Sequence, residues 1–237
     1  MITNIIPSLR HYWHLLLPSC CLWCSLPVQH AQQQLCTCCQ QALPSLPYPL
    51  CHYNLLWLPV VSKSIKKPLF QQLLALSYYH HPYQHWIQQW KFFANHAAGE
   101  LLQQQFISLL SRYAKHTIAL PQAILYVPMH PSRQRKRGFN QAEILAKAAA
   151  KQLKLPLLNV LQRQHKNPAQ VGLNRKQRQR NLKQAFSLQT TAALPSHVAL
   201  IDDVITTGAT ANELCRLLKR NGVSHISLWT LAVTVLD

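Results

Sequence analysis

The stretch Val198-Ala-Leu-Ile-Asp-Asp-Val-Ile-Thr-Thr-Gly-Ala-Thr210 decides the fold of this chain. Its apolar, β-branched beginning predicts a buried strand over Val198–Val204, and its end leads into a predicted helix over Thr210–Arg220. The strand carries two adjacent carboxylates, Asp202 and Asp203, at its C-terminal end. This end of a strand is where open α/β sheets place their ligands.

The residues that follow the two acids have the composition of an anion site. Thr206 and Thr207 offer hydroxyl groups, and Gly208 lets the backbone come close to a ligand. Free N–H groups at the start of a helix attract negative charge. An anion site beside two paired acids does not suit a ligand that is only an anion. We expect instead a sugar phosphate whose hydroxyls donate to the acids, with Mg²⁺ nearby. The alternative is a capped helix after a strand that ends in two solvated aspartates.

The segments around this stretch alternate as they do in α/β folds. Ala123–Pro128 is a short apolar run that predicts a strand, and Ile226–Val233 predicts another. Between them, Asn140–Lys154 carries its apolar residues on one helical face. Because strands that alternate with helices predict a parallel sheet, we expect a Rossmann-like α/β domain over residues 119–237.

Two further regions precede the α/β domain. Residues 1–55 are rich in cysteine and proline, and we expect a small Cys-rich module there. Residues 56–118 are expected to form a mainly helical connecting region. Within it, Tyr83–Leu110 repeats apolar residues every three or four positions, which predicts an amphipathic helical pair. Its Trp and Phe residues, Phe93 among them, are expected in the core rather than in a base-stacking platform.

A second motif also follows a predicted strand and precedes a predicted helix. It reads Val127-Pro-Met-His-Pro-Ser-Arg-Gln-Arg-Lys-Arg-Gly-Phe-Asn-Gln141, and we expect it at the same edge of the sheet. Its cations form a basic loop whose fork-like donors suit a pyrophosphate. These cations are Arg133, Arg135, Lys136 and Arg137. Asn140 is a suitable cap for the following helix, and the alternative reading is a generic basic loop.

Positive charge extends beyond this motif. The chain has 24 Lys and Arg residues against 6 Asp and Glu residues, a formal net charge of +18. Between Arg133 and Lys183 there are fourteen cations and a single acid, Glu143. A block of this length repels itself unless it meets an anion, which favours phosphates or nucleic acid as a partner. The alternative is a solvated basic face.

The cysteines indicate a metal site. Seven of the eight lie between Cys20 and Cys51, and clustered cysteines in a cytosolic protein are reduced and bind metal rather than form disulfides. Two Cys-x-x-Cys pairs have a spacing that allows tetrahedral ligation of a structural Zn²⁺ ion. The predicted ligands are Cys21, Cys24, Cys36 and Cys39. Cys20, Cys38 and Cys51 remain alternative ligands, and Cys215 is expected in the core.

Together these motifs resemble the ComF/GntX family of competence-associated, phosphoribosyltransferase-like proteins. The run Val198–Thr210 resembles the motif with which type I phosphoribosyltransferases bind phosphoribosyl pyrophosphate (PRPP), and the likeness implies their fold. By that likeness, Asp202 and Asp203 bind the ribose hydroxyls of PRPP, which is accompanied by Mg²⁺. The residues that then bind the 5-phosphate are Thr206, Thr207, Gly208, Ala209 and Thr210.

The family likeness continues over residues 163–186, which resemble a mobile basic hood above the site. The hood cations and the link to competence imply contact with single-stranded DNA. The cations concerned are Arg175, Lys176, Arg178 and Arg180. The same likeness implies DNA-uptake or recombination proteins as candidate partners.

Two functions of different classes follow from these observations. The first is a competence protein whose PRPP-binding domain serves natural transformation and the handling of internalised single-stranded DNA. The second is a genuine phosphoribosyltransferase that acts on an unidentified base or amine with PRPP and Mg²⁺. A purely structural zinc adaptor leaves the PRPP motif unexplained. The sequence contradicts a glutamine-dependent amidophosphoribosyltransferase, because that reaction needs a glutaminase domain with an N-terminal cysteine and residue 2 is Ile.

The sequence contains no residue that we can predict as a general base. Phosphoribosyl transfer passes through an oxocarbenium-like state and often needs only positioning, so this does not decide between the two functions. No apolar run approaches the ~18 residues that a membrane span needs. The N-terminal segment also lacks the apolar stretch of a signal peptide, because Arg10, His11 and His14 interrupt it. We therefore expect a cytoplasmic protein.

Overall fold

The computed structural model describes residues 19–30, 33–163, 185–190 and 192–235. At its centre, four strands pair in the order β1-β6-β5-β2, and every pair is parallel. These strands are β1 (Gln72–Tyr78), β2 (Ala123–Tyr126), β5 (His197–Ile205) and β6 (His225–Val233). The predicted α/β class with a parallel sheet is confirmed.

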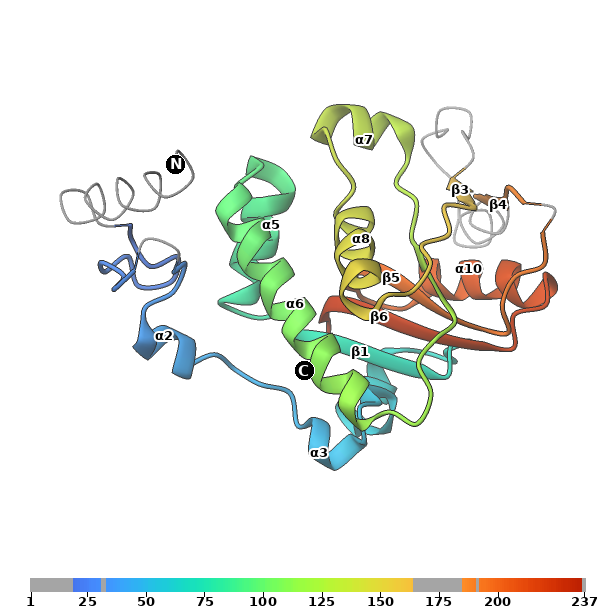
Figure 1. The fold of residues 1–237 in the computed structure, drawn as a ribbon, viewed down its shortest axis with the longest axis horizontal. Helices are drawn as coiled ribbons and strands as arrows, with labels where there is room; N and C mark the ends of the chain where they lie inside the picture. Colours follow the sequence, from blue (N-terminus) through green and yellow to red (C-terminus); the bar gives the residue numbers. More distant parts are fainter. Residues whose placement is uncertain (1–18, 31–32, 164–184, 191, 236–237) are drawn as a thin grey trace, which may run out of the picture.

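Helices cover the sheet and connect its strands (Figure 1). The main helices are α5 (Tyr83–Phe93), α6 (His96–His116), α8 (Gln141–Leu153) and α10 (Ala209–Arg220). α6 and α8 pack against each other and against the sheet. The short elements are α2 (Thr37–Gln41), α3 (Tyr48–Cys51), η1 (Leu55–Trp57), α4 (Pro59–Ser64), α7 (Pro131–Arg137), and the antiparallel strands β3 (Leu161–Arg163) and β4 (Phe186–Leu188).

The stretch that decides the fold forms the strand and the helix that its pattern predicts. Residues Val198–Ile201 of β5 are fully buried, because β5 lies between β6 and β2 and both faces of the sheet are covered. The helix α10 begins at Ala209, one residue before the predicted start. It places Leu214, Cys215 and Leu218 in the core. The core position predicted for Cys215 is confirmed.

Strand β1 lies in the region that we expected to be mainly helical. Its apolar run Leu73–Leu76 is buried and pairs with β6, so that Leu74 lies opposite Trp229. The run shows no alternation because a strand covered on both faces needs none. Leu and Ala also favour helices, so the pattern did not indicate a strand. The expected connecting region therefore contributes an edge strand to the central sheet.

The predicted helical pair is present as α5 and α6. Trp86, Ile87 and Trp90 are buried, as expected for core residues. Gly99 of α6 allows close packing of the two helices, because a Cβ atom there would lie 2.6 Å from the Trp90 ring nitrogen. Phe93 was expected in the core and is instead 72% exposed. It is the last residue of α5, beyond the buried residues with which this helix packs.

The basic motif is a short helix and not the loop that we expected. α7 begins with Pro131 in its first turn, and His130 Nδ1 accepts a hydrogen bond from the Ser132 N–H at 3.2 Å. Gly138 ends the helix with a φ of 85°, a left-handed conformation that favours glycine. These caps outweigh the mutual repulsion of three cations in the last turn. As predicted, Asn140 caps the following helix through its bond to the Ala142 N–H.

Parts of the predicted hood are absent from the described residues. The stretch is described at its two ends, where Arg163 ends β3 and Phe186 begins β4. The hood cations Arg175, Lys176, Arg178 and Arg180 lie outside the described residues. Within the ranges that the structure describes, no helix has both the length and the apolar character needed to cross a membrane.

Candidate functional site

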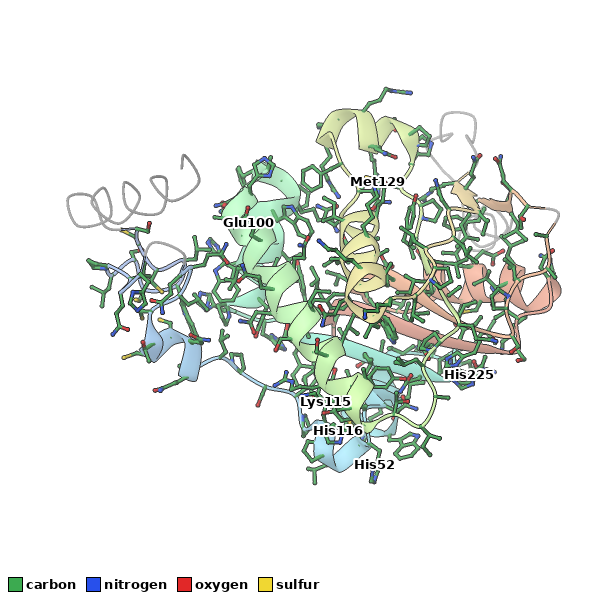
Figure 2. The ribbon with its side chains drawn as sticks, viewed as in Figure 1. His52, Glu100, Lys115, His116, Met129 and His225 are labelled. Carbon is green, nitrogen blue, oxygen red and sulfur yellow. The ribbon has the colours of Figure 1, made fainter. Side chains whose placement is uncertain are left out.

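The two polar motifs leave the sheet side by side. β2 and β5 are parallel neighbours, and Tyr126 at the end of β2 lies opposite Ile201, one residue before the acid pair. The Val127 N–H extends this pairing by donating to the Ile201 carbonyl at 2.9 Å. Met129, just after β2, lies beneath α7 in Figure 2, well apart from His225 at the start of β6. The acids and the basic helix α7 therefore share one edge of the sheet.

The acid pair is partly charged. Burial raises the pKa of Asp202 to about 8, and the charge of Asp203 acts in the same direction. Asp203 itself is neutralised by Lys91 of α5, whose Nζ lies 2.6 Å from Asp203 Oδ2. At neutral pH the pair thus combines a protonated carboxyl group with an ion-paired carboxylate. Such a pair can both donate to and accept from the hydroxyl groups of a sugar.

The two acids meet different cations because adjacent residues of a strand point to opposite faces. Asp203 contacts Lys91, and its charge also opposes the lowering of the pKa of Arg137 that burial causes. Asp202 has the corresponding effect on Arg163 of β3, where burial again is the largest cause of a lowered pKa. The cations around the two acids overlap, because Lys91 also acts on Asp202 and Arg133 acts on both Arg137 and Arg163.

A cavity of about 500 Å³ lies between the end of α5 and α7, the two helices at the top of Figure 1. Its lining residues are Lys91, Phe92, Ala94, Arg133, Lys136 and Arg137. Three of the four cations predicted for the basic motif thus line one cavity, and Arg135 does not. Sequence reasoning missed Lys91, because its partner Asp203 is 112 residues away along the chain and no local pattern marks it.

A second cavity of about 410 Å³ lies on the other side of α7, beside Arg163. Its walls carry amide, phenol, carboxyl and guanidinium groups from β2, α7, α8 with its cap, β3 and the segment before β3. The polar lining residues are Tyr126, Gln134, Asn140, Glu143, Asn159, Gln162 and Arg163. The Tyr126 hydroxyl donates to Asn159 Oδ1 at 2.7 Å. Donors and acceptors of this kind suit a planar polar molecule such as a nucleobase.

The loop after the acids has the backbone geometry of an anion site. Thr206 and Thr207 are exposed, and Gly208 precedes the first turn of α10 with a φ of 75°. A Cβ atom on Gly208 would lie 3.0 Å from Ile65, so glycine is favoured both by conformation and by space. On α10, the Asn212 side chain accepts from the Leu69 N–H at 2.8 Å. The helix start is therefore fixed, and its free N–H groups face the loop.

The four predicted cysteine ligands lie together. The Sγ atoms of Cys21, Cys24, Cys36 and Cys39 are all within 4.8 Å of one another. The Cys24 and Cys36 sulfurs are 3.7 Å apart, close to the ~3.8 Å edge of a tetrahedron with Zn–S bonds of about 2.3 Å. Cys20, Cys38 and Cys51 are not members of this cluster. Cys51 is instead fully buried in the core.

Backbone N–H groups surround the cysteine sulfurs. Burial raises the pKa of Cys21, but N–H groups of Cys24, Cys36 and Trp23 outweigh it and lower the pKa to about 6. The Cys39 N–H donates to Cys36 Sγ at 3.5 Å. The pKa values of Cys24 and Cys39 are instead raised, that of Cys39 chiefly by burial. Cysteine binds a metal as the thiolate, so metal binding at this cluster would release protons. The module is attached to the main domain by the Trp86 indole N–H, which donates to the Leu22 carbonyl at 3.1 Å.

Comparison with known proteins shows relatives over almost the whole chain. Competence protein F of Haemophilus influenzae is 36% identical over 220 residues, which cover 90% of this chain and 96% of that protein. The DNA utilization protein YhgH of Escherichia coli K12 is 29% identical over 231 residues, which cover 93% and 100%. Competence protein ComFC of Streptococcus pneumoniae is 31% identical over 131 residues, which cover 55% and 56%. No family model matches the chain.

Solved structures with a related arrangement are phosphoribosyltransferases. Adenine phosphoribosyltransferase of Leishmania tarentolae has a TM-score of 0.37 and 12% identity, covering 56% of this chain and 70% of that chain. A hypoxanthine phosphoribosyltransferase of Staphylococcus aureus has a TM-score of 0.35 and 14% identity, covering 57% and 64%.

Proposed function

The chain belongs to the ComF family of competence proteins, and from this premise we propose that it binds PRPP and handles internalised single-stranded DNA during natural transformation. One observation supports the ligand above all. A strand ends in an acid pair, continues into a Thr-Thr-Gly loop at a helix start, and lies beside a cavity lined with cations. At this edge of the sheet the acid pair suits the sugar of PRPP, the loop suits its 5-phosphate, and the cations suit its pyrophosphate.

The proposed division of roles follows the chemistry of each group. Asp202 and Asp203 bind the ribose hydroxyls, and an Mg²⁺ ion that accompanies PRPP would displace the proton of Asp202 to bind an oxygen of that acid. The 5-phosphate lies on the helix start and is held by Thr206, Thr207, Gly208, Ala209 and Thr210. The pyrophosphate lies toward α7, where Arg133, Lys136 and Arg137 donate to it. Arg135 is exposed outside the cavity, where it is accessible to a larger polyanion.

The DNA role rests on the names of the relatives and on the excess of cations. Competence protein F and a DNA utilization protein are relatives over at least 90% of this chain. The hood cations Arg175, Lys176, Arg178 and Arg180, which lie outside the described residues, extend the positive charge of α7 along the sequence. We place this function in the cytoplasm, with DNA-uptake or recombination proteins as partners.

We also propose that the cysteine cluster holds a structural Zn²⁺ ion. Four thiolate ligands at tetrahedral spacing suit zinc, which binds in closed four-cysteine sites without further chemistry. The ion would fix a module that has little core of its own.

A genuine phosphoribosyltransferase is the second candidate function. The cavity beside Arg163 favours it, because its amide and carboxyl groups offer an acceptor site close to Asp202. In such a reaction the acceptor nitrogen forms a bond to the ribose carbon as the bond to pyrophosphate breaks. The acceptor loses a proton and pyrophosphate leaves.

Calorimetric titration with PRPP and Mg²⁺ tests the ligand site. We expect binding by the parent protein and none by the Asp202→Asn, Asp203→Asn double variant. Equal binding by both proteins would refute the ribose role. Incubation with PRPP and a panel of bases and amines then separates the two functions, because only a transferase releases pyrophosphate in the presence of an acceptor.

A further inference from the structure

An exposed aromatic ring lines the cavity between α5 and α7. Phe92 is 66% exposed, although it adjoins a buried helix contact made by Trp90. The helix ends directly afterwards, because Ala94 takes a left-handed conformation with a φ of 50°. The last turn of α5 therefore presents Phe92 toward α7. The exposed ring therefore stands within reach of a ligand in a cavity whose other walls carry cations.

The cations around this ring lack compensating charge. Lys91 pairs with Asp203, but no carboxylate in the described part of the chain forms an ion pair with Arg133, Lys136 or Arg137. Arg137 uses one N–H group to donate to a neutral side chain, Gln141, at 2.8 Å. Three neighbouring cations without a partner acid attract an anion with more than one charge.

The ring and the cations are in contact with each other. The Arg137 guanidinium lies 5.8 Å from the centre of the Phe92 ring. Arginine and aromatic side chains side by side are the elements of a single-strand binding groove, where cations bind the backbone and rings stack on bases. A duplex does not fit this description, because the faces of its bases are covered by their neighbours. The cavity of about 500 Å³ lies within the range of small-ligand sites.

We infer that the cavity between α5 and α7 binds one nucleotide of a single DNA strand, with its base stacked on Phe92 and its phosphates on Arg133 and Lys136. This inference rests on the proposed function, and it adds an aromatic residue that contacts the strand by stacking on a base. The Phe92 ring distinguishes a nucleotide from the pyrophosphate of PRPP as the ligand of this cavity. A pyrophosphate uses the same cations but gains nothing from an aromatic face.

The neighbouring residue provides a matched control. Phe93 is 72% exposed and lies outside the cavity lining, so Phe93→Ala removes the same ring from the same helical turn. Both substitutions remove exposed rings, and circular dichroism and thermal melting check that both variants fold. Phe92→Tyr restores a ring at the proposed stacking position.

Fluorescence anisotropy with a labelled oligothymidylate of about twenty nucleotides measures the contact. We expect Phe92→Ala to weaken binding by about 5- to 150-fold, the loss of one stacked base, while its salt dependence stays that of the parent. Phe93→Ala and Phe92→Tyr should bind like the parent. Lys136→Ala should instead lower the slope against salt by about 0.7, the value of one phosphate contact.

The outcomes separate this inference from the function on which it rests. If the parent binds DNA and Phe92→Ala binds equally well, the stacking site is wrong and the DNA function stands. Equal losses of affinity for the oligonucleotide in the Phe92→Ala and Phe93→Ala variants also refute the stacking site. If the parent binds no DNA, both proposals fail. Calorimetry with PRPP should give the same affinity for the parent and Phe92→Ala, and a matching loss there would assign the ring to the PRPP site instead.

Discussion

Lys91 Nζ lies 2.6 Å from Asp203 Oδ2, and this contact joins α5 to the strand end that carries the acid pair. Both side chains are largely shielded from solvent, with exposed fractions of 25% and 17%. The pair therefore holds together two segments that are distant along the sequence. It also places a cation at the wall of the α5–α7 cavity.

Replacement of Lys91 by Met should destabilise the protein by about 1–3 kcal/mol, between the values of exposed and fully buried ion pairs. The loss arises because Asp203 keeps its partly buried charge without a partner. The control is Lys147→Met, which breaks the exposed pair with Glu143 on α8 and should cost about 0.5 kcal/mol or less. Urea unfolding of the three proteins measures both effects, and equal stabilities of the two variants would contradict the role of Lys91.

The Asp202→Asn variant should gain stability over the parent as the pH rises. The folded protein holds a proton on Asp202 up to a pKa of about 8, whereas the unfolded chain releases it near the ordinary aspartate pKa of 3.8. Between these values the folded state binds the extra proton, so the stability of the parent falls with rising pH. Asparagine does not titrate, and the variant is free of this loss. Melting temperatures at pH 5 and pH 8 test the prediction, and a constant difference would refute it.

His197, at the opposite end of β5, should make the stability of the protein depend on pH in the opposite direction. Burial and the neighbouring His225 lower the pKa of His197 to about 4, and its Nε2 lies 3.0 Å from the Ser227 hydroxyl. The unfolded chain binds a proton near pH 6.5 and the folded state does not, so stability is lost as the pH falls from 6.5 toward 4. His197→Asn should make the melting temperature depend less on pH over this window. His80→Gln, a change at an exposed histidine, should leave it unchanged.

How far the sequence predicted this structure depends on how local each signal was. The β5 strand and the start of α10 follow from adjacent residues, and the clustering of Cys21, Cys24, Cys36 and Cys39 follows from the spacing of two Cys-x-x-Cys pairs. The caps of α7 were also readable, since Pro131 and Gly138 flank the cations at the positions that begin and end a helix. The prediction of a basic loop did not use these two positions.

Strand β1 and Lys91 could not be found in the same way. The run Leu73–Leu76 has no period, and only its pairing with β6 decides between strand and helix. Lys91 is one cation among many until the fold brings it to Asp203. Phe93 belongs to an apolar pattern that predicts burial, and the end of α5 exposes both Phe93 and its neighbour Phe92. Residues whose roles depend on distant partners become visible only when the elements are assembled.

Protein purified without added metal should contain close to one Zn²⁺ ion per chain. The four sulfurs of the cluster lie within 4.8 Å of one another, so replacing Cys36 and Cys39 by Ser removes half of the ligands. Zinc should then be lost and the described part of the Cys-rich module should unfold, because such a small module depends on its metal. Cys20→Ser and Cys38→Ser, outside the cluster, should retain the metal. Elemental analysis measures the content, and zinc retained by the double variant would exclude this ligand set.

The dependence of DNA binding on salt distinguishes the competence protein from the transferase. Cations that bind phosphates release counterions, so the logarithm of the affinity should fall linearly with the logarithm of the salt concentration, by about 0.7 per contact on a single strand. Replacing the hood cations Arg175, Lys176, Arg178 and Arg180 by Ala should reduce this slope by up to about 3 and weaken binding equally for all sequences. If these residues serve only to close the site over PRPP, the slope stays the same and the affinity for PRPP falls instead. Anisotropy at about 150 mM salt completes the test, because electrostatic binding that survives there is strong enough for a role on DNA. A parent protein that retains no oligonucleotide under this condition would favour the transferase.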